Sequence, residues 1–296
     1  MLWTSGEALI DIIVNPRGGC TFNPGGSMLN TAMNLGRRGV SVGFVGISGE
    51  DAAGNFLRKY LMESGINTSH LSSVTGFRTP MALAFLDAQG KASYTFYRDT
   101  LPADHLYFPE TGEGDIILVG SYQSIQDEVH HRLMDWVQVS RSKGALIIYD
   151  PNFRRPHLHD LQRLLPRILC LMQHADIVKA SDEDLQLVLG IADGRQAWER
   201  ISGLGPQALA YTMGADGAAW FDRWDEIRLP APEVEVISTI GAGDAFNAGL
   251  MAGLADYSSL EGFMHDRHRK NEVMNQAIQI ASEVCRLESN FVDRQH

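Results

Sequence analysis

The feature that most constrains this chain is a run of small residues leading directly into an aspartate. The run reads Ser238-Thr239-Ile240-Gly241-Ala242-Gly243-Asp244, and an apolar segment at helical spacing, 245–254, follows it. Glycines let backbone N–H groups come close to a ligand, and the start of a helix adds its unpaired N–H groups at the same place. The segment therefore predicts an anion-binding turn in front of a helix, of the kind that stabilises phosphate.

Asp244 adds a second chemical function to this turn. A carboxylate beside a phosphate site can accept the proton of an attacking hydroxyl group, which is the other half of phosphoryl transfer to an alcohol. We therefore interpret the segment as part of a kinase that acts on a small hydroxylated substrate. A sharp turn between a strand and a helix would also require glycines, and this motif alone does not separate the two interpretations.

The composition narrows the class of protein. The 296 residues can bury a large core in one α/β domain, and the longest apolar runs have the length of a strand. The net charge of −11 argues against nucleic acid as a partner, because phosphate contacts need a basic surface. Three widely spaced cysteines suit reduced thiols, and the first residues lack the pattern of a secretory signal. We expect a cytoplasmic protein with no membrane partner.

Alternating strands and helices predict a doubly wound, mostly parallel sheet with helices on both faces. The amino-terminal part reads as βαβ units, with strands at Leu9–Val14 and Ser41–Gly46 and helices at Ser27–Arg38 and Ala52–Ser64. Later strands are expected near residues 116–119, 146–149, 177–179, 209–212, 218–221 and 227–229. Ligands of such open sheets bind beyond the carboxyl ends of the strands.

One segment breaks this alternation. Residues 78–87 and 91–98 flank the turn Asp87-Ala88-Gln89-Gly90 and predict an antiparallel hairpin. We therefore expect one domain, 1–296, with a small β lid formed by about 11–24 and 74–98.

A second glycine motif lies near the amino terminus. Asp11 ends a strand, and Pro24-Gly25-Gly26-Ser27-Met28-Leu29-Asn30 follows after a short excursion. A carboxylate and an amide near a glycine turn are suited to holding several sugar hydroxyls, because Asp accepts hydrogen bonds and Asn both accepts and donates them. A simple turn followed by a surface Asn30 is the alternative.

Together these motifs resemble the PfkB (ribokinase-like) family of carbohydrate kinases over nearly the whole chain. Gly25-Gly26 with Asn30 resembles its amino-terminal signature. Gly49-Glu50-Asp51-Ala52-Ala53-Gly54 resembles its G-x-D-x-x-G turn, and Thr239-Ile240-Gly241-Ala242-Gly243-Asp244 resembles its carboxyl-terminal signature. Two ordered signatures with a third motif between them are a far more specific match than any one of them.

The resemblance implies a role for individual residues. Asp244 would be the catalytic base, and the backbone amides of Gly241, Ala242 and Gly243 would form the anion hole. Asp11, Gly25, Gly26 and Asn30 would hold the sugar. The segment Thr212-Met213-Gly214-Ala215-Asp216-Gly217 resembles the family's T-x-G-x-x-G, so Thr212, Gly214 and Gly217 would lie along the nucleotide. A tight hairpin between strands would explain these three residues equally well.

The resemblance also implies ATP and Mg²⁺ as cosubstrate and cofactor, with a lid that closes over the sugar and excludes water. Whether the protein forms a homodimer through this lid is left undecided by the sequence. The family's metal-supporting N-x-x-E segment appears here as Ser181-Asp182-Glu183-Asp184, so Asp184 would support Mg²⁺ through water. A helix capping box made by Ser181 and Asp184 is an alternative that can coexist with this role. Ser238 replaces the aspartate that several relatives use near a monovalent cation, so dependence on such a cation stays open.

Two arginine segments bear on the choice of sugar. Phe96-Tyr97-Arg98 and Asp150-Pro151-Asn152-Phe153-Arg154 resemble segments of fructokinases and of 2-keto-3-deoxygluconate kinases. Arginine suits a carboxylate but also binds neutral hydroxyls, and Arg98 could instead pair with Asp99 or Asp104, and Arg154 with Asp160. The segment 179–183 looks more like fructokinases, so we favour fructose, with Arg98 and Arg154 as candidate sugar contacts.

Two other classes remain as rivals. Ser238 and Ser181 would suit a sugar-binding or regulatory protein that kept the fold and lost the chemistry, because fold does not guarantee activity. A nucleotide-dependent oxidoreductase is a weaker hypothesis, because the first strand is not followed by G-x-G-x-x-G.

Overall fold

A large, mostly parallel sheet forms the centre of the molecule in the computed structural model, which describes residues 1–14, 19–86, 92–257 and 259–293. In the described residues the strands lie in the order β14-β13-β12-β11-β10-β9-β1-β4-β5, and β6 pairs with β4. Their bounds are β1 Leu2–Ser5, β4 Val42–Gly49, β5 Ile66–Asn67, β6 Leu71–Val74, β9 Ile116–Gly120, β10 Leu146–Asp150, β11 Ile177–Ser181, β12 Ala208–Thr212, β13 Ala218–Asp222 and β14 Glu226–Leu229. Only the β12–β13 and β13–β14 pairs are antiparallel among these strands.

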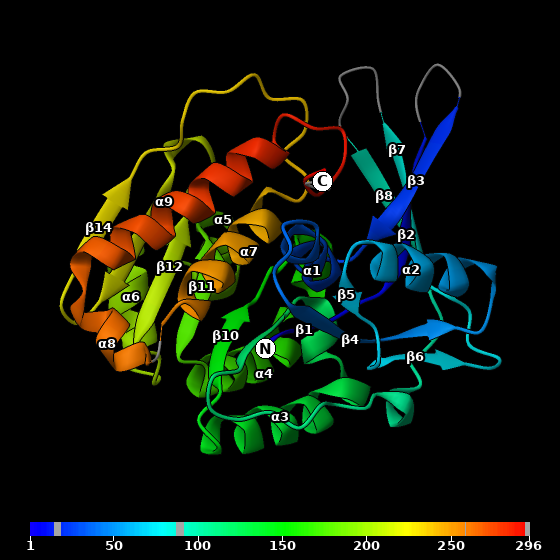
Figure 1. Ribbon diagram of the computed structural model, residues 1–296, viewed down its shortest axis with the longest axis horizontal. Coiled ribbons are helices and arrows are strands. Elements are labelled where there is room, and N and C mark those ends of the chain that lie inside the picture. Colours follow the sequence, from blue (N-terminus) through cyan, green and yellow to red (C-terminus); the bar gives the residue numbers. More distant parts are fainter. Residues whose placement is uncertain (15–18, 87–91, 258, 294–296) are drawn as a thin grey trace.

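Helices cover both faces of this sheet, so the predicted fold class is confirmed (Figure 1). One face packs against α1 Ser27–Arg37, α2 Ala52–Glu63, α7 Ala242–Ala255, α8 Leu260–His265 and α9 Arg267–Val284. The other face packs against α3 Asp127–Ser142, α4 Leu161–His174, α5 Asp182–Leu189 and α6 Gly194–Ser202. Short 3₁₀ helices lie at Ala103–His105 (η1), Tyr122–Ile125 (η2), Arg155–Asp160 (η3) and Gly214–Asp216 (η4).

The first strand of the central sheet is Leu2–Ser5, not Leu9–Val14 as the sequence indicated. β1 lies between β4 and β9, with Trp3 opposite Gly43 on one side and Ile117 on the other. A Cβ atom on Gly43 would lie 2.2 Å from the Trp3 ring, so the indole fills the space that this glycine leaves. Four residues ending in Thr4 and Ser5 gave too weak an apolar pattern to be recognised as a buried strand.

The segment Leu9–Val14 forms β2 in a second, four-stranded sheet. Its order is β3-β2-β7-β8, with β3 at Cys20–Gly25, β7 at Met81–Leu86 and β8 at Ala92–Tyr97. The predicted hairpin is confirmed by the antiparallel β7–β8 pair, whereas its turn, 87–90, lies outside the described residues. These strands fall within the segments expected to form a lid, apart from the first two residues of β2 and the last residue of β3.

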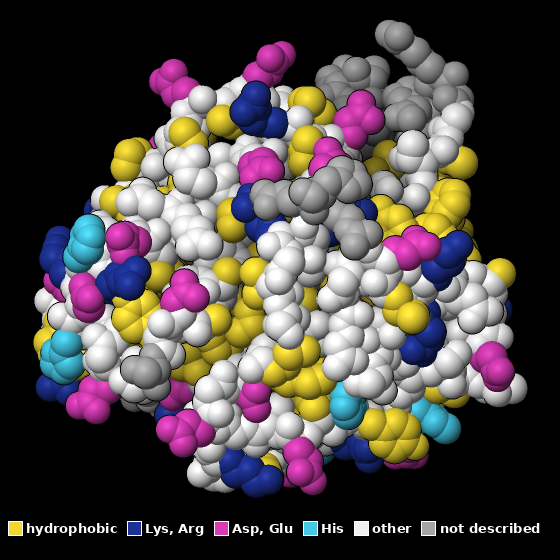
Figure 2. Space-filling view, viewed as in Figure 1, with side chains coloured by type: hydrophobic (Ala, Val, Ile, Leu, Met, Phe, Trp, Pro, Cys, Tyr) yellow, Lys and Arg dark blue, Asp and Glu magenta, His cyan; other side chains and the backbone are white. Residues whose placement is uncertain are grey.

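The surface fits the acidic composition. On the face shown in Figure 2, basic and acidic side chains are interspersed and form no continuous basic patch. Among the described residues, no helix is both long and apolar enough to cross a membrane.

Candidate active site

The glycine turn forms the start of α7, at the carboxyl ends of β10 and β11. Gly241 is the N-cap residue and has a left-handed backbone, with φ of 83°. A Cβ atom at this position would lie 2.4 Å from the carbonyl oxygen of Asn290, so both the conformation and the close contact require glycine. Asp244 therefore falls in the first turn of the helix.

The amides of this turn are largely unpaired. None of the residues that the structure describes accepts a hydrogen bond from the N–H groups of Gly241, Gly243 or Asp244, while the Ala242 N–H donates to the Thr239 carbonyl at 3.3 Å. Helix-terminal N–H groups and the helix dipole together favour an anion at such a position. The expected anion hole thus has its donors in place, although one of the three predicted amides is already engaged.

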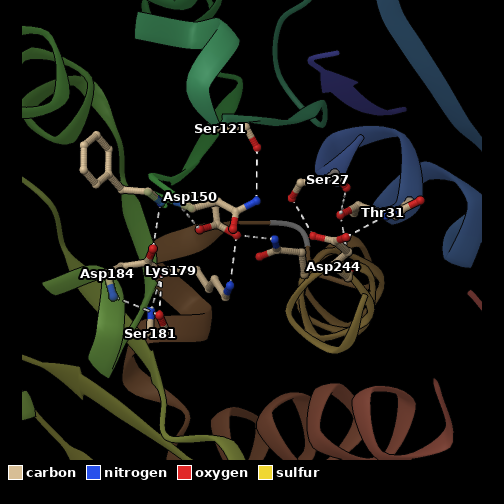
Figure 3. A network of polar contacts seen from close by, with 12 residues as sticks. Ser27, Thr31, Ser121, Asp150, Lys179, Ser181, Asp184 and Asp244 are labelled. Carbon is tan, nitrogen blue, oxygen red and sulfur yellow. Dashed lines mark hydrogen bonds and ion pairs between the residues drawn. The ribbon is translucent and has the colours of Figure 1, made fainter. Parts of the chain in front are cut away.

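Asp244 faces the start of α1 and not the apolar core (Figure 3). Its Oδ1 accepts a hydrogen bond from the Ser27 hydroxyl at 2.5 Å, and its Oδ2 accepts one from the Asn30 amide at 2.9 Å. The Thr31 hydroxyl donates a hydrogen bond to the backbone carbonyl of Asp244 at 3.1 Å. Only 8% of Asp244 is exposed. The two glycine motifs, more than 200 residues apart in the sequence, therefore form one site.

Burial raises the pKa of the Asp244 carboxyl above its ordinary value, while the hydrogen bonds from Ser27 and Asn30 and the charge of Lys179 oppose this rise. A raised pKa makes a carboxylate a stronger base, which suits the acceptance of a proton.

Gly25 and Gly26 allow the second sheet to approach the start of α1. A Cβ on Gly25 would lie 2.2 Å from Oδ2 of Asp11, and one on Gly26 would lie 2.1 Å from the Glu7 carbonyl. Burial, together with the charges of Asp244 and Glu7, raises the pKa of Asp11 to about 7. The Oδ1 atom of Asn30 is buried and has no partner among the described residues. The predicted sugar-binding residues thus come together beside Asp244 and offer free acceptors.

The two arginines differ in their surroundings. Arg98 pairs with Glu7 at 3.1 Å, and its guanidinium lies 4.9 Å from the centre of the Tyr122 ring. The alternative pairings with Asp99 or Asp104 were wrong, because Arg78 binds the first and Arg132 lies near the second. Arg154 is exposed, and no described residue forms an ion pair or hydrogen bond with its side chain. The alternative pairing of Arg154 with Asp160 was also wrong, since that carboxylate contacts Arg163.

A buried ion pair that sequence reasoning missed lies beside the first turn of α7 (Figure 3). The Lys179 ammonium donates to Oδ2 of Asp150 at 2.9 Å, and the amide of Asn247 donates to the same oxygen at 2.7 Å. A Cβ on Gly243 would lie 3.1 Å from Lys179 Nζ, so the cation touches the glycine turn. Lys179 lies within a segment that the resemblance already singled out, but sequence alone could not place it under α7.

Asp184 forms the predicted capping box with Ser181, the N-cap residue of α5. Its Oδ2 accepts hydrogen bonds from the backbone and the hydroxyl of Ser181, and the Ser181 hydroxyl in turn accepts the Asp184 N–H, so the capping box is confirmed. Its Oδ1 accepts the Phe153 N–H at 2.8 Å. No cluster of three or more His, Cys, Asp or Glu side chains that could hold a metal occurs within the described residues. Both oxygens of Asp184 already accept hydrogen bonds, and the remaining lone pair of Oδ1 leaves room for a bound water.

The T-x-G-x-x-G segment forms the predicted hairpin between β12 and β13. Gly214 and Gly217 have φ of 56° and 91°, and Thr212 ends β12 next to Ser181. The segment lies at the edge of the sheet where the parallel strands end.

Comparison with known proteins agrees with this geometry. Residues 3–284 match the pfkB family of carbohydrate kinases, so the chain belongs to this family and is a sugar kinase. It is 30% identical to a fructokinase of Klebsiella pneumoniae over 263 residues, which covers 86% of this chain and 84% of the relative. It is 27% identical to an aminoimidazole riboside kinase of Salmonella typhimurium, over 86% of this chain and 81% of that one.

Solved structures show the same fold. A fructokinase of Vibrio cholerae O395, in a form with fructose, ADP and calcium bound, superposes with a TM-score of 0.87 at 22% identity, covering 98% of this chain and 94% of that one. The aminoimidazole riboside kinase of Salmonella enterica superposes with a TM-score of 0.86 at 23% identity, covering 99% and 96%.

Proposed function

We propose that this protein transfers the γ-phosphoryl group of ATP to a hydroxyl of fructose. The observation that carries the proposal is the carboxylate of Asp244, which lies in the same helical turn as unpaired N–H groups and faces the residues around Gly26. Relatives named fructokinases, and a fructokinase structure with fructose and ADP, support the choice of substrates.

The sugar would lie among Asp11, Gly26 and Asn30, with the reacting hydroxyl against Asp244. As this hydroxyl attacks the phosphorus in line, Asp244 accepts its proton. The amides of Gly241 and Gly243 would stabilise charge on the transferring group, and Ala242 would join them once its long contact with Thr239 is released. The buried ammonium of Lys179 lies against this turn, and the Asp150 carboxylate opposes its charge.

The nucleotide would extend along the carboxyl ends of β11 and β12, past Thr212, Gly214 and Gly217. Magnesium would enter as part of the ATP complex, and we propose that Asp184 contacts it only through water. The hydroxyl of Ser238 is neutral and offers no negative charge for a monovalent cation, and it accepts the Ile240 N–H at 3.1 Å.

The environment of Arg98 favours a neutral sugar over an acid sugar. Its charge is opposed by Glu7 at 3.1 Å; burial raises the pKa of this carboxyl above its ordinary value, and the guanidinium of Arg98 counteracts part of that rise. A 2-keto-3-deoxygluconate kinase, the alternative, needs a cation that is free for the substrate carboxylate. We retain Arg98 as a contact to neutral hydroxyls and Arg154 as a contact that could form only if its exposed side chain moves inward.

We also propose that the chain forms a single domain and that its four-stranded sheet acts as the lid of the sugar site. The same sheet would form the contact of a homodimer, and the enzyme would act in the cytoplasm. Phe22, Phe85 and Tyr97 are exposed, and the strand register places them on the face opposite Asp11. Light scattering in solution would test the dimer.

A coupled ADP-release assay over fructose, 2-keto-3-deoxygluconate, ribose and nucleosides tests the function. We expect the highest kcat/KM with fructose. Activity on the acid sugar alone would reject our substrate but keep the mechanism. Sugar binding without any ADP release would support a non-catalytic protein instead.

A further inference from the structure

A pocket extends from the sugar-facing side of the second sheet toward the central sheet. The register pairs Asp11 with Ala82 and Ala82 with Phe96. Because residues two positions apart on a strand share a face, Leu9 and Arg98 point to the same side as Asp11. The lining of the pocket includes Glu7, Leu9, Pro80, Arg98, Gln123 and Gln126. Leu9 and Arg98 therefore place the pocket on the same side of the second sheet as the proposed sugar site.

Gln123 lines this pocket from η2, the short helix that follows β9. The residue is only 2% exposed, and no described residue hydrogen-bonds its carboxamide. Neither its oxygen nor its nitrogen is among the fully buried side-chain atoms that lack a partner, so both keep accessible surface, and Gln123 lines the pocket. A ligand in the pocket can therefore form hydrogen bonds with this carboxamide.

The charges around the pocket define the chemistry of that ligand. Glu7 opposes Arg98, and Asp99 is paired with Arg78. The Tyr122 ring, next to Gln123 in η2, packs against the guanidinium of Arg98. The carboxamides of Gln123 and Gln126, which also line the pocket, are neutral groups that can donate and accept hydrogen bonds and so complement a hydroxyl group better than a charged group.

We propose that Gln123 determines specificity by hydrogen-bonding a hydroxyl of the sugar remote from the one that is phosphorylated. Neither Asp244 nor Asn30 lines this pocket, so its ligand group is separate from the reacting hydroxyl. The inference rests on the proposed sugar kinase function and adds to it the group that recognises the far end of the substrate.

The test combines a variant with a set of fructose analogues that each lack one hydroxyl. With the unmodified protein, removal of the hydroxyl bound by Gln123 should lower kcat/KM by roughly 10-fold. In Gln123→Leu, kcat/KM for fructose should fall by about the same factor, and that one analogue should no longer be discriminated. Gln138→Leu, an exposed glutamine on α3, should keep the original pattern.

A merely structural role would lower activity with all analogues alike, so an unchanged discrimination pattern in Gln123→Leu overturns the inference. If Gln123→Leu does not fold, Gln123→Met keeps an unbranched chain and is measured in its place. If another neutral sugar is the better substrate, the same set is built on that sugar. If no neutral sugar is bound in calorimetry or phosphorylated, both this inference and the proposed function fail.

Discussion

Replacing Asp244 by Asn removes the proton acceptor and leaves the shape of the site nearly unchanged. The introduced amide oxygen can still accept from the Ser27 hydroxyl. Its nitrogen would meet the Asn30 amide as donor against donor, but Asn30 can turn over, because its own Oδ1 is buried and has no partner. We therefore expect Asp244→Asn to fold and to bind sugar nearly as well as the original protein.

Turnover should respond very differently from binding. A positioned general base contributes about 10²- to 10⁴-fold, so kcat should fall by that factor. This corresponds to about 3 to 5 kcal/mol of lost transition-state stabilisation. Coupled ADP release measures kcat, and calorimetry with fructose in the absence of nucleotide measures sugar affinity.

Asp256→Asn serves as the matched control, because it removes a carboxylate from the exposed other end of α7. This variant should keep both sugar affinity and turnover. An Asp244→Asn protein whose kcat stays within a few-fold of the original, on the scale of general-base effects, would refute the assignment of Asp244 as the base.

Three further outcomes are expected. The pKa of Asp11 is raised to about 7, so the native state holds its proton more tightly and loses stability as pH rises from about 4 to 7. Asp11→Asn should therefore raise the free energy of unfolding, and with it Tm, more at pH 8 than at pH 5. The gain in free energy should differ between the two pH values by at most about 4 kcal/mol, and an equal shift in Tm at both would contradict this. Lys179→Met leaves Asp150 buried without its cation and should cost about 3 to 5 kcal/mol in urea unfolding. Adding Asp150→Asn should restore most of this stability, and no recovery would argue against the pair. Glu7→Gln frees the charge of Arg98 and should raise kcat/KM for 2-keto-3-deoxygluconate relative to fructose by roughly 10-fold, whereas an unchanged ratio would remove Arg98 from the choice of substrate.

The features that the sequence predicted well are local. The turn before α7 and the β7–β8 hairpin depend on residue types within about ten positions, such as glycine followed by apolar periodicity. The capping box of Ser181 and Asp184 is likewise encoded by four consecutive residues. Periodicity and turn chemistry were sufficient for these elements.

Contacts between distant segments could not be predicted in the same way. Ser27 is within the amino-terminal motif, yet nothing in the sequence indicates that it donates to Asp244, 217 positions away. The pairing of Lys179 with Asp150 depends on β10 and β11 being neighbours in the sheet. The ion pair between Glu7 and Arg98 was not predicted, because it depends on how the second sheet, whose last strand Arg98 follows, lies against the start of the chain.

Asp150 ends β10, and its Oδ2 atom accepts hydrogen bonds both from Lys179 of β11 and from Asn247 of α7. Three separate stretches of the gene are thereby coupled through a single atom. A substitution at any one of these three positions would remove a partner from the others, so we expect a change at one position to be accompanied by a change at another. Among natural variants, these three codons should change together or stay fixed.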